Sequence, residues 1–185
     1  TKTIIPVHRN GRAVDMEELN KLTKEYSLPV IEDAAQALFS RNAVGYLGTQ
    51  SKVGCFSLGV TKLITTGQGG VVVTRDKEIY DRLRSLQDQG DPAKANEFNG
   101  MGFNFKYTSM MAAIGKAQLA RVPDRIAHLK AIYAKYEAGL SEFPFIKLIP
   151  VNVTNGEVPL WVEAMSKERD MLRKFLSSKG IDTIE

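Results

Sequence analysis

The first third of the chain alternates short apolar segments with a helical segment, and this order limits the fold. Residues 3–8 are predicted to form a strand, and Asp15 followed three residues later by Glu18 is typical of a helix N-terminus. Apolar residues then recur at helical spacing as far as Tyr26, and residues 28–31 form a short apolar run typical of a buried parallel strand. Strand, helix and strand in this order predict a βαβ unit.

The middle of the chain continues the same alternation. Two further strands are expected at residues 53–58 and 70–74, the second followed by an amphipathic helix at residues 77–87. Residues 89–100 are polar and contain proline and several glycines, so they are predicted to form a loop. Thr108 is expected to cap another helix.

Pro123 interrupts a helical pattern and is expected to mark a kink or a boundary. A long amphipathic helix is expected from Asp124 to about Glu142, and strand and helix patterns alternate again after it. We therefore predict an α/β protein in which residues 1–123 are part of a large domain, with a mostly parallel sheet and flanking helices, and residues 124–185 are part of a small α/β domain. Because the chain begins and stops in predicted strands, we expect it to be an incomplete part of a larger protein.

Composition excludes several classes of protein. No apolar run approaches the roughly 20 residues needed to span a bilayer, so no membrane association is expected. The formal net charge is +4, but basic residues alternate with acidic ones, which argues against nucleic-acid binding. A single cysteine, Cys55, and an N-terminus without a signal-peptide pattern favour the cytoplasm. Cysteine, histidine and acidic residues have no metal-ligand spacing, so no metal is expected.

Two residues stand where open α/β sheets bind ligands, beyond the carboxyl ends of predicted strands. An acid at Asp33 can pair with a cationic ring nitrogen, although a lone aspartate is more often a helix N-cap. A lysine at Lys62, in low-dielectric surroundings, can act as an amine nucleophile, although most lysines lie on the surface. The glycines of residues 67–70 lead into a strand rather than a helix, which favours a structural turn over a phosphate loop. None of these residues alone identifies a function.

The ordered set of motifs resembles the DegT/StrS-type sugar aminotransferases, which have fold type I of aspartate aminotransferase. In chain order the motifs are PVH at 6–8, EDAAQA at 32–37, GCFS at 54–57, Lys62, TGQGG at 66–70, GFNF at 102–105, AAIG at 112–115 and QL at 118–119. The resemblance covers nearly the whole chain and is strongest from Ile4 to Leu119. It implies a central fragment of such an enzyme.

The resemblance also implies a cofactor, pyridoxal 5'-phosphate (PLP), and roles for the matching residues. Lys62 would form a Schiff base with PLP and move protons, and Asp33 would keep the pyridine nitrogen protonated. Gln36 would contact the cofactor ring or its phenolic oxygen, and Ser57 would donate a hydrogen bond to the phosphate. Asn104 would reach the phosphate of a neighbouring subunit, which implies a homodimer.

The implied reaction transfers an amino group from an amino acid such as glutamate to a nucleotide-linked keto-sugar, in the biosynthesis of nucleotide sugars for cell-surface polysaccharides. Two alternatives stay open. Related dehydratases use pyridoxamine phosphate and carry histidine at the lysine position, and Lys62 argues against that chemistry. The other alternative is a catalytically incompetent remnant or assembly module that keeps the motifs without a working site.

Some positions depart from the family's pattern. Gln68 stands where glutamate is usual, Lys106-Tyr107 replace Arg-Met, and Ser109 replaces an acid. The family's N-terminal phosphate loop and ring-stacking aromatic lie outside this chain, so we expect the chain alone to bind PLP weakly.

Three further residues have structural interpretations. His8 is expected to be a hydrogen-bonded structural histidine, and Cys55 is expected to be a small core residue rather than a nucleophile. Trp161 is expected to pack the core of the second domain, with stacking on a substrate as the alternative.

Overall fold

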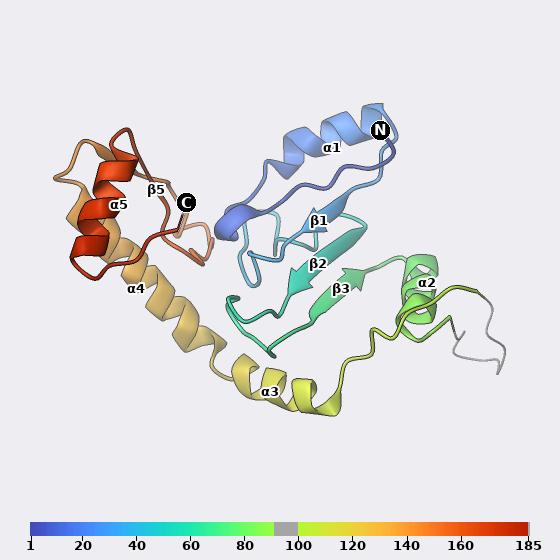
Figure 1. Ribbon diagram of the computed structural model, residues 1–185. Coiled ribbons are helices and arrows are strands. Elements are labelled where there is room, and N and C mark those ends of the chain that lie inside the picture. Colours follow the sequence, from blue (N-terminus) through green and yellow to red (C-terminus); the bar gives the residue numbers. More distant parts are fainter. Residues whose placement is uncertain (91–99, 185) are drawn as a thin grey trace.

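The computed structural model describes residues 1–90 and 100–184 and confirms the predicted α/β class (Figure 1). Most of the predicted loop lies within residues 91–99, outside the described residues. The helices are α1 (Met16–Glu25), α2 (Lys77–Gln87), α3 (Ser109–Leu119), α4 (Val122–Leu140) and α5 (Arg169–Ser178), and a 3-10 turn covers Arg9–Gly11. The strands are β1 (Ile31–Asp33), β2 (Val53–Ser57), β3 (Gly70–Thr74), β4 (Ile146–Leu148) and β5 (Ala164–Ser166).

The larger sheet has the order β1-β2-β3 and is mixed in direction. β1 runs parallel to β2, and β3 adds an antiparallel strand on the other side of β2. The N-terminal segment runs parallel to β1 through two isolated bridges, Ile4 with Val30 and Val7 with Asp33. Since α1 connects these two parallel segments, the predicted βαβ unit is present.

The strand predicted at residues 28–31 begins later than its apolar pattern suggests. Pro29 has no N–H to donate to a ladder, and Val30 forms only an isolated bridge to Ile4. Regular pairing therefore begins at Ile31, and the polar Glu32 and Asp33 belong to the strand itself rather than to the turn after it.

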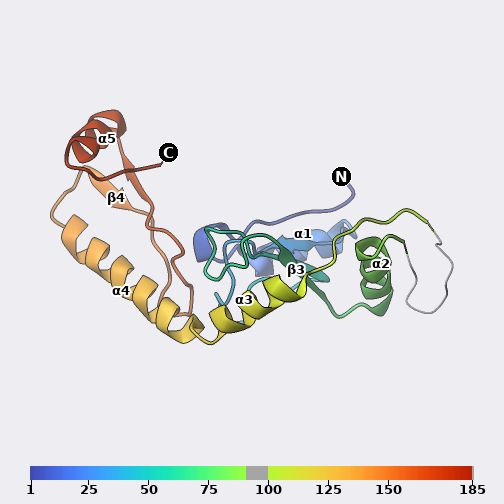
Figure 2. The ribbon, with the colours of Figure 1, turned by 60° about the horizontal axis from the view of Figure 1, so that its bottom comes forward.

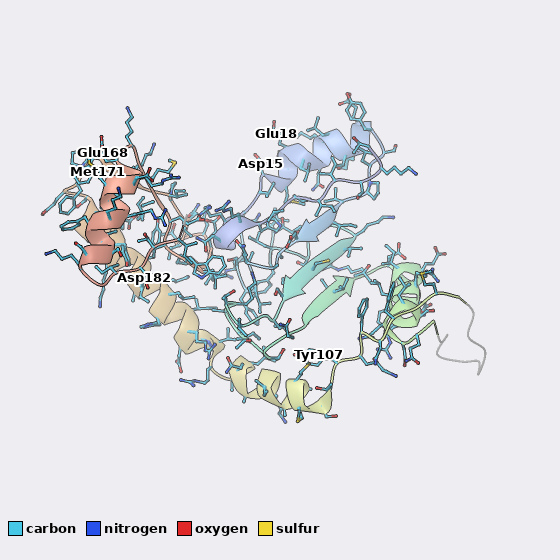
Figure 3. The ribbon with its side chains drawn as sticks, in the orientation of Figure 1. Asp15, Glu18, Tyr107, Glu168, Met171 and Asp182 are labelled. Atoms are coloured by element: carbon cyan, nitrogen blue, oxygen red, sulfur yellow. The ribbon has the colours of Figure 1, made fainter. Side chains whose placement is uncertain are left out.

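Side-chain caps define the starts of three helices. The Asp15 carboxylate accepts a hydrogen bond from the Glu18 amide at the first turn of α1, where Figure 3 shows both residues. Asp76 caps α2, which covers the predicted range, and the Thr108 hydroxyl accepts from the Met111 amide at the start of α3. These capping residues satisfy amides that have no partner within their own helix.

Pro123 lies in the first turn of α4 and causes no kink inside a helix. Proline is tolerated there because first-turn amides need no intrahelical acceptor. Figure 2 shows α3 and α4 following one another along one side of the molecule, separated by a short break before Val122. The proline thus marks a boundary between two helices, one of the two predicted outcomes.

The second half of the chain forms an antiparallel pair, β4 and β5, beside α4 and α5. Tyr133 of α4 is buried, and its hydroxyl donates to the Ile149 carbonyl and accepts from the Val151 amide, 3.0 Å away. The chain then returns to the large sheet, where the Val158 amide donates to the Ser40 hydroxyl. The division into domains at residue 123 stays a prediction, and residues 151–163 contact both parts.

Two small apolar cores support the edge of the sheet. One packs Ala34, Ala37 and Leu47 with Ala13 and Phe56. The other packs Leu58, Ile64 and Val122 with Leu38, Phe39 and Ile126, and so joins the loop after β2 to the start of α4. The loop that carries Lys62 is therefore anchored to a helix.

No helix in the described part of the chain is both long and apolar enough to cross a membrane. Within residues 1–90 and 100–184, no group of three or more histidine, cysteine or acidic side chains is arranged to hold a metal ion.

Candidate active site

Asp33 and Ser57 lie at the carboxyl ends of neighbouring parallel strands. The register pairs Asp33 of β1 with Cys55 of β2, and Ser57 follows Cys55 by two residues. Because side chains alternate between the two faces of a sheet, Asp33, Cys55 and Ser57 face the same side. A carboxylate and a hydroxyl are thus brought to one edge of one face.

The Asp33 carboxylate is half-buried and only partly hydrogen-bonded. Its Oδ1 accepts from the Ala35 amide at 3.0 Å, and it has no other hydrogen bond among the described residues. Burial, the larger influence, and the Asp33 charge both raise the pKa of the Cys55 thiol. Cys55 therefore stays a thiol at neutral pH, which agrees with a structural rather than a nucleophilic role.

Lys62 lies in the anchored loop after β2. Its amide donates to the Gly59 carbonyl at 3.1 Å, and the next two residues, Leu63 and Ile64, are buried. Its Nζ lies over the indole of Trp161, 5.4 Å from the ring centroid. Within the described residues no carboxylate forms an ion pair with this ammonium group. The amine is therefore positioned without being neutralised by a fixed counter-ion.

The Ser57 hydroxyl is oriented by the turn that follows it. Its oxygen accepts a hydrogen bond from the Gly59 amide at 3.2 Å. In the described part of the chain no acceptor takes the hydroxyl hydrogen, so the group can donate to a phosphate oxygen.

A buried asparagine connects Gln36 to the surroundings of Lys62. The Asn10 amide donates to Gln36 Oε1 at 2.9 Å. The Asn10 side chain forms two hydrogen bonds with the backbone of Trp161, one to its carbonyl and one from its amide, each of 2.6 Å. Because the Trp161 ring contacts Lys62, Gln36 and Lys62 belong to one connected cluster.

Asn104 has no hydrogen bond to the other four predicted site residues within the described part of the chain. It is exposed, and its backbone bridges to Asp88 at the end of α2. The neighbouring Lys106 forms an ion pair with Asp88 at 2.8 Å. Strand register and contacts connect Asp33 with Ser57, and Gln36 with the surroundings of Lys62, at the sheet edge, whereas no interaction within the described residues links Asn104 to them.

Glu32 and His8 form a buried pair on the opposite face of β1. His8 accepts from the Val14 amide through Nδ1, so its Nε2 carries the proton donated to Glu32, 2.9 Å away. The carboxylate also accepts from the amides of Gly48, Gln50 and Ser51. Burial, the largest single influence, raises the pKa of Glu32, but the hydrogen bonds together hold it below its usual value. His8 is thus a hydrogen-bonded structural histidine, as expected.

Sequence reasoning did not identify Asn10, and the expectation for Trp161 was wrong. Trp161 does not fill the core of the predicted second domain. It is 40% exposed, and its ring lies against Lys62. The Asn-Gly pair at residues 10–11 was a usable signal, because both residues have positive φ in the tight turn. No local sequence pattern predicts the contact of Trp161 with Lys62, because the two residues are far apart in the sequence.

Two surface hollows of the molecule lie apart from the residues of this cluster. Both lie beside α5 and are lined by residues between 166 and 183. Figure 3 shows Glu168, Met171 and Asp182 around this helix. The candidate site therefore rests on the contacts at the sheet edge.

The residues at the sheet edge fit the chemistry of PLP. The cofactor needs an anion at its ring nitrogen, an amine at its aldehyde and donors at its phosphate. Among the residues that the structure describes, Asp33 has a carboxylate oxygen free of protein hydrogen bonds and Lys62 has an amine without a carboxylate partner. Ser57 has a hydroxyl hydrogen to donate. The fold and these three groups are those that the class of PLP-dependent transferases of amino groups requires.

Comparison with known proteins gives the family. The model of the DegT/DnrJ/EryC1/StrS aminotransferase family matches residues 1–184, and the chain belongs to this family. Aminotransferases of this family depend on PLP.

Curated relatives and solved structures agree with the family. The chain is 34% identical over 190 residues to GDP-perosamine synthase from Caulobacter vibrioides, covering 99% of this chain and 51% of that protein. It is 35% identical to dTDP-3-amino-3,4,6-trideoxy-alpha-D-glucose transaminase from Streptomyces venezuelae, covering 100% of this chain and 48% of that protein. The crystal structure of S. venezuelae DesV in complex with a ketimine intermediate matches with a TM-score of 0.90 and 34% identity, over 98% of this chain and 49% of that one. The chain thus spans about half the length of the curated relatives it matches.

Proposed function

We propose that the chain carries the PLP site of an aminotransferase that transfers an amino group from an amino acid such as glutamate to a nucleotide-linked keto-sugar in the cytoplasm. The position of the Lys62 amine is the observation that carries the proposal: it lies in the anchored loop that follows Ser57, over the Trp161 ring, and without a carboxylate partner among the described residues. The names of the sugar-aminating relatives support the substrate class.

Each site residue has a distinct task in this proposal. PLP supplies an electron sink that stabilises charge on the carbon bearing the amino group. Lys62 would hold the cofactor through its amine and would move protons at that carbon, and Asp33 would keep the ring nitrogen protonated. Ser57 donates to the phosphate, and Gln36 contacts the ring or its phenolic oxygen from a position set by Asn10.

A homodimer is part of the proposal because the resemblance assigns Asn104 to a neighbouring subunit's phosphate, and within the described residues Asn104 is bridged to Asp88 and has no hydrogen bond to Asp33, Gln36, Ser57 or Lys62. Two exposed aromatic rings, Phe103 and Phe105, flank Asn104 and stack on each other with centroids 4.9 Å apart. Exposed aromatic groups beside a polar residue are typical of interfaces. A second subunit that covers them would receive Asn104 at its phosphate site.

Borohydride trapping tests the assignment of Lys62. The protein is saturated with PLP, reduced with sodium borohydride, digested and analysed by mass spectrometry. The expected result is a pyridoxyl adduct on the peptide containing Lys62. The Lys62→Arg variant keeps the positive charge but cannot form the adduct, so it serves as the control.

The outcome also separates the alternatives. Absence of an adduct on Lys62 at saturating PLP would contradict the proposal and support a catalytically incompetent remnant. An adduct together with amino transfer from glutamate excludes a role limited to assembly. Sugar dehydration without net amino transfer would instead support the dehydratase.

Mass measurement by light scattering tests the dimer. The wild-type protein is expected to have the mass of a dimer, and Phe105→Glu is expected to shift it toward the monomer, because a charge replaces an apolar contact. Phe145→Glu, which changes another exposed aromatic away from Asn104, is expected to leave the mass unchanged. A wild-type monomer at micromolar concentration would refute this part of the proposal.

A further inference from the structure

Trp161 presents an aromatic ring to the same space as the Lys62 amine. The Lys62 ammonium lies over this ring, 5.4 Å from its centroid, although the two residues come from opposite halves of the chain. Trp161 is 40% exposed, so packing within the chain uses only part of its surface. The rest of the indole is available to a ligand that approaches Lys62.

The backbone beneath this ring is held in place before any ligand arrives. Asn10, which is fully buried, forms hydrogen bonds of 2.6 Å with both the carbonyl and the amide of Trp161. On one side Pro159 is fully buried, and on the other Glu163 forms ion pairs with Arg9 and Arg12. An exposed aromatic on a rigid support is suited to recognition, because little conformational entropy is lost on binding.

We propose that Trp161 contacts the sugar ring of the acceptor substrate and helps to select it, an inference that rests on the proposed aminotransferase function. The carbon that receives the amino group must come close to Lys62, and a pyranose is similar in size to the six-membered ring of indole. The face of an indole ring is electron-rich and attracts the positively polarised C–H groups on the apolar face of a sugar. A small amino-acid donor has no such face and gains little from Trp161.

A positioning role through Lys62 is the competing interpretation. In that case the ring acts only by holding the ammonium group, which takes part in the reactions of both donor and acceptor. Loss of the ring would then change both half-reactions, whereas a sugar contact concerns only the acceptor. The two half-reactions can be measured separately.

Fluorescence gives a direct test, because Trp161 is the only tryptophan in the chain. The PLP-saturated protein is titrated with GDP-mannose and with dTDP-glucose, which have no keto group and cannot be aminated, and with GDP and dTDP alone. The expected result is a change in Trp161 emission with a nucleotide sugar that is absent with the corresponding nucleotide at equal saturation. Calorimetry establishes the degree of saturation.

Variants test the selection of the acceptor. In Trp161→Leu the keto-sugar concentration at half-saturation is expected to rise about 3- to 10-fold, the range that a lost aromatic contact produces. The rate of the glutamate half-reaction is expected to change less than about two-fold, as for a variant that loses no transition-state contact with the donor. Trp161→Phe keeps an aromatic face and is expected to recover most of the affinity. The control is Phe145→Leu, which removes an exposed aromatic ring immediately before β4 and shows the general effect of such a loss on the kinetics.

The outcomes separate this inference from the proposed function. Nucleotide-sugar binding without a sugar-dependent change in emission overturns the role of Trp161 alone. Equal effects of Trp161→Leu on both half-reactions also overturn it and favour positioning of Lys62. If no nucleotide sugar binds and no adduct forms on Lys62, the proposed function fails, and this inference fails with it.

Discussion

The buried carboxylate of Glu32 holds the backbone of the loop before β2 in place. It is fully buried and accepts hydrogen bonds from His8 and from the amides of Gly48, Gln50 and Ser51. Two donors point at each of its oxygens, so the loop that precedes β2 is folded around this one side chain. The loop in turn positions the strand that ends in Ser57.

Replacement of Glu32 by Gln tests this arrangement. The amide NH₂ group would face two N–H donors, so two hydrogen bonds are lost and buried donors are left without acceptors. The free energy of unfolding, measured with urea, is expected to fall by about 2–4 kcal/mol. Glu17→Gln, at an exposed position on α1, is the control and is expected to change it by less than about 0.5 kcal/mol.

The pH dependence of stability follows from the lowered pKa of Glu32. As the pH falls, the unfolded chain takes up this proton first, near the ordinary value of 4.5, and the folded protein takes it up later. The contribution of Glu32 is therefore fully present above that value and is lost as the pH falls through the lowered pKa. Urea unfolding between neutral and acidic pH should show the difference between wild type and Glu32→Gln shrinking in acid. A constant difference would contradict the assignment.

Among the elements, α1 illustrates a helix defined by its cap. The Asp15 carboxylate accepts from the Glu18 amide at 3.0 Å, and the helix exposes most of its surface. Asp15→Ala is expected to lower the free energy of unfolding by about 1 kcal/mol, while Asp15→Ser is expected to recover most of the loss. Thermal and urea unfolding measure both variants. Similar losses for alanine and serine would show that the hydrogen bond is not the cause.

At the scale of the whole molecule, residues 151–163 join the second half of the chain to the large sheet. Gly11 lies where this segment crosses the N-terminal turn. A Cβ added there would lie 1.8 Å from the Val158 carbonyl oxygen, and Gly11 has φ of +84°. Gly67 has the same φ, but no atom lies within 4 Å of an added Cβ. The two glycines thus share the same φ, and they differ in whether an added Cβ would clash with neighbouring atoms.

This pair gives a matched test of the contact. Gly67→Ala is expected to cost about 1 kcal/mol of stability, the usual penalty for a left-handed alanine. Gly11→Ala is expected to cost about 1–3 kcal/mol more, because the Val158 segment must move. Hydrogen exchange should show reduced protection around residues 156–161 only in Gly11→Ala. Equal losses in the two variants would argue against a tight crossing.

Local patterns were sufficient for several of the elements. The capped helices, the strand at residues 70–74 and the helix at 77–87 follow from periodicity and capping, which depend on near neighbours along the chain. Asp33 and Lys62 were singled out by their places after predicted strands, and Ser57 by the resemblance of short motifs to the family; their roles stay predictions.

Only the tertiary structure decided which of these residues meet. The register of β1 and β2 puts Asp33 and Ser57 on one face, and the Asn10 hydrogen bonds bring Trp161 to Lys62 from the other half of the chain. Such contacts join residues that are far apart in the sequence, so local periodicity does not predict them. The sequence therefore determines the chemistry of each side chain, whereas tertiary packing determines which side chains lie close together.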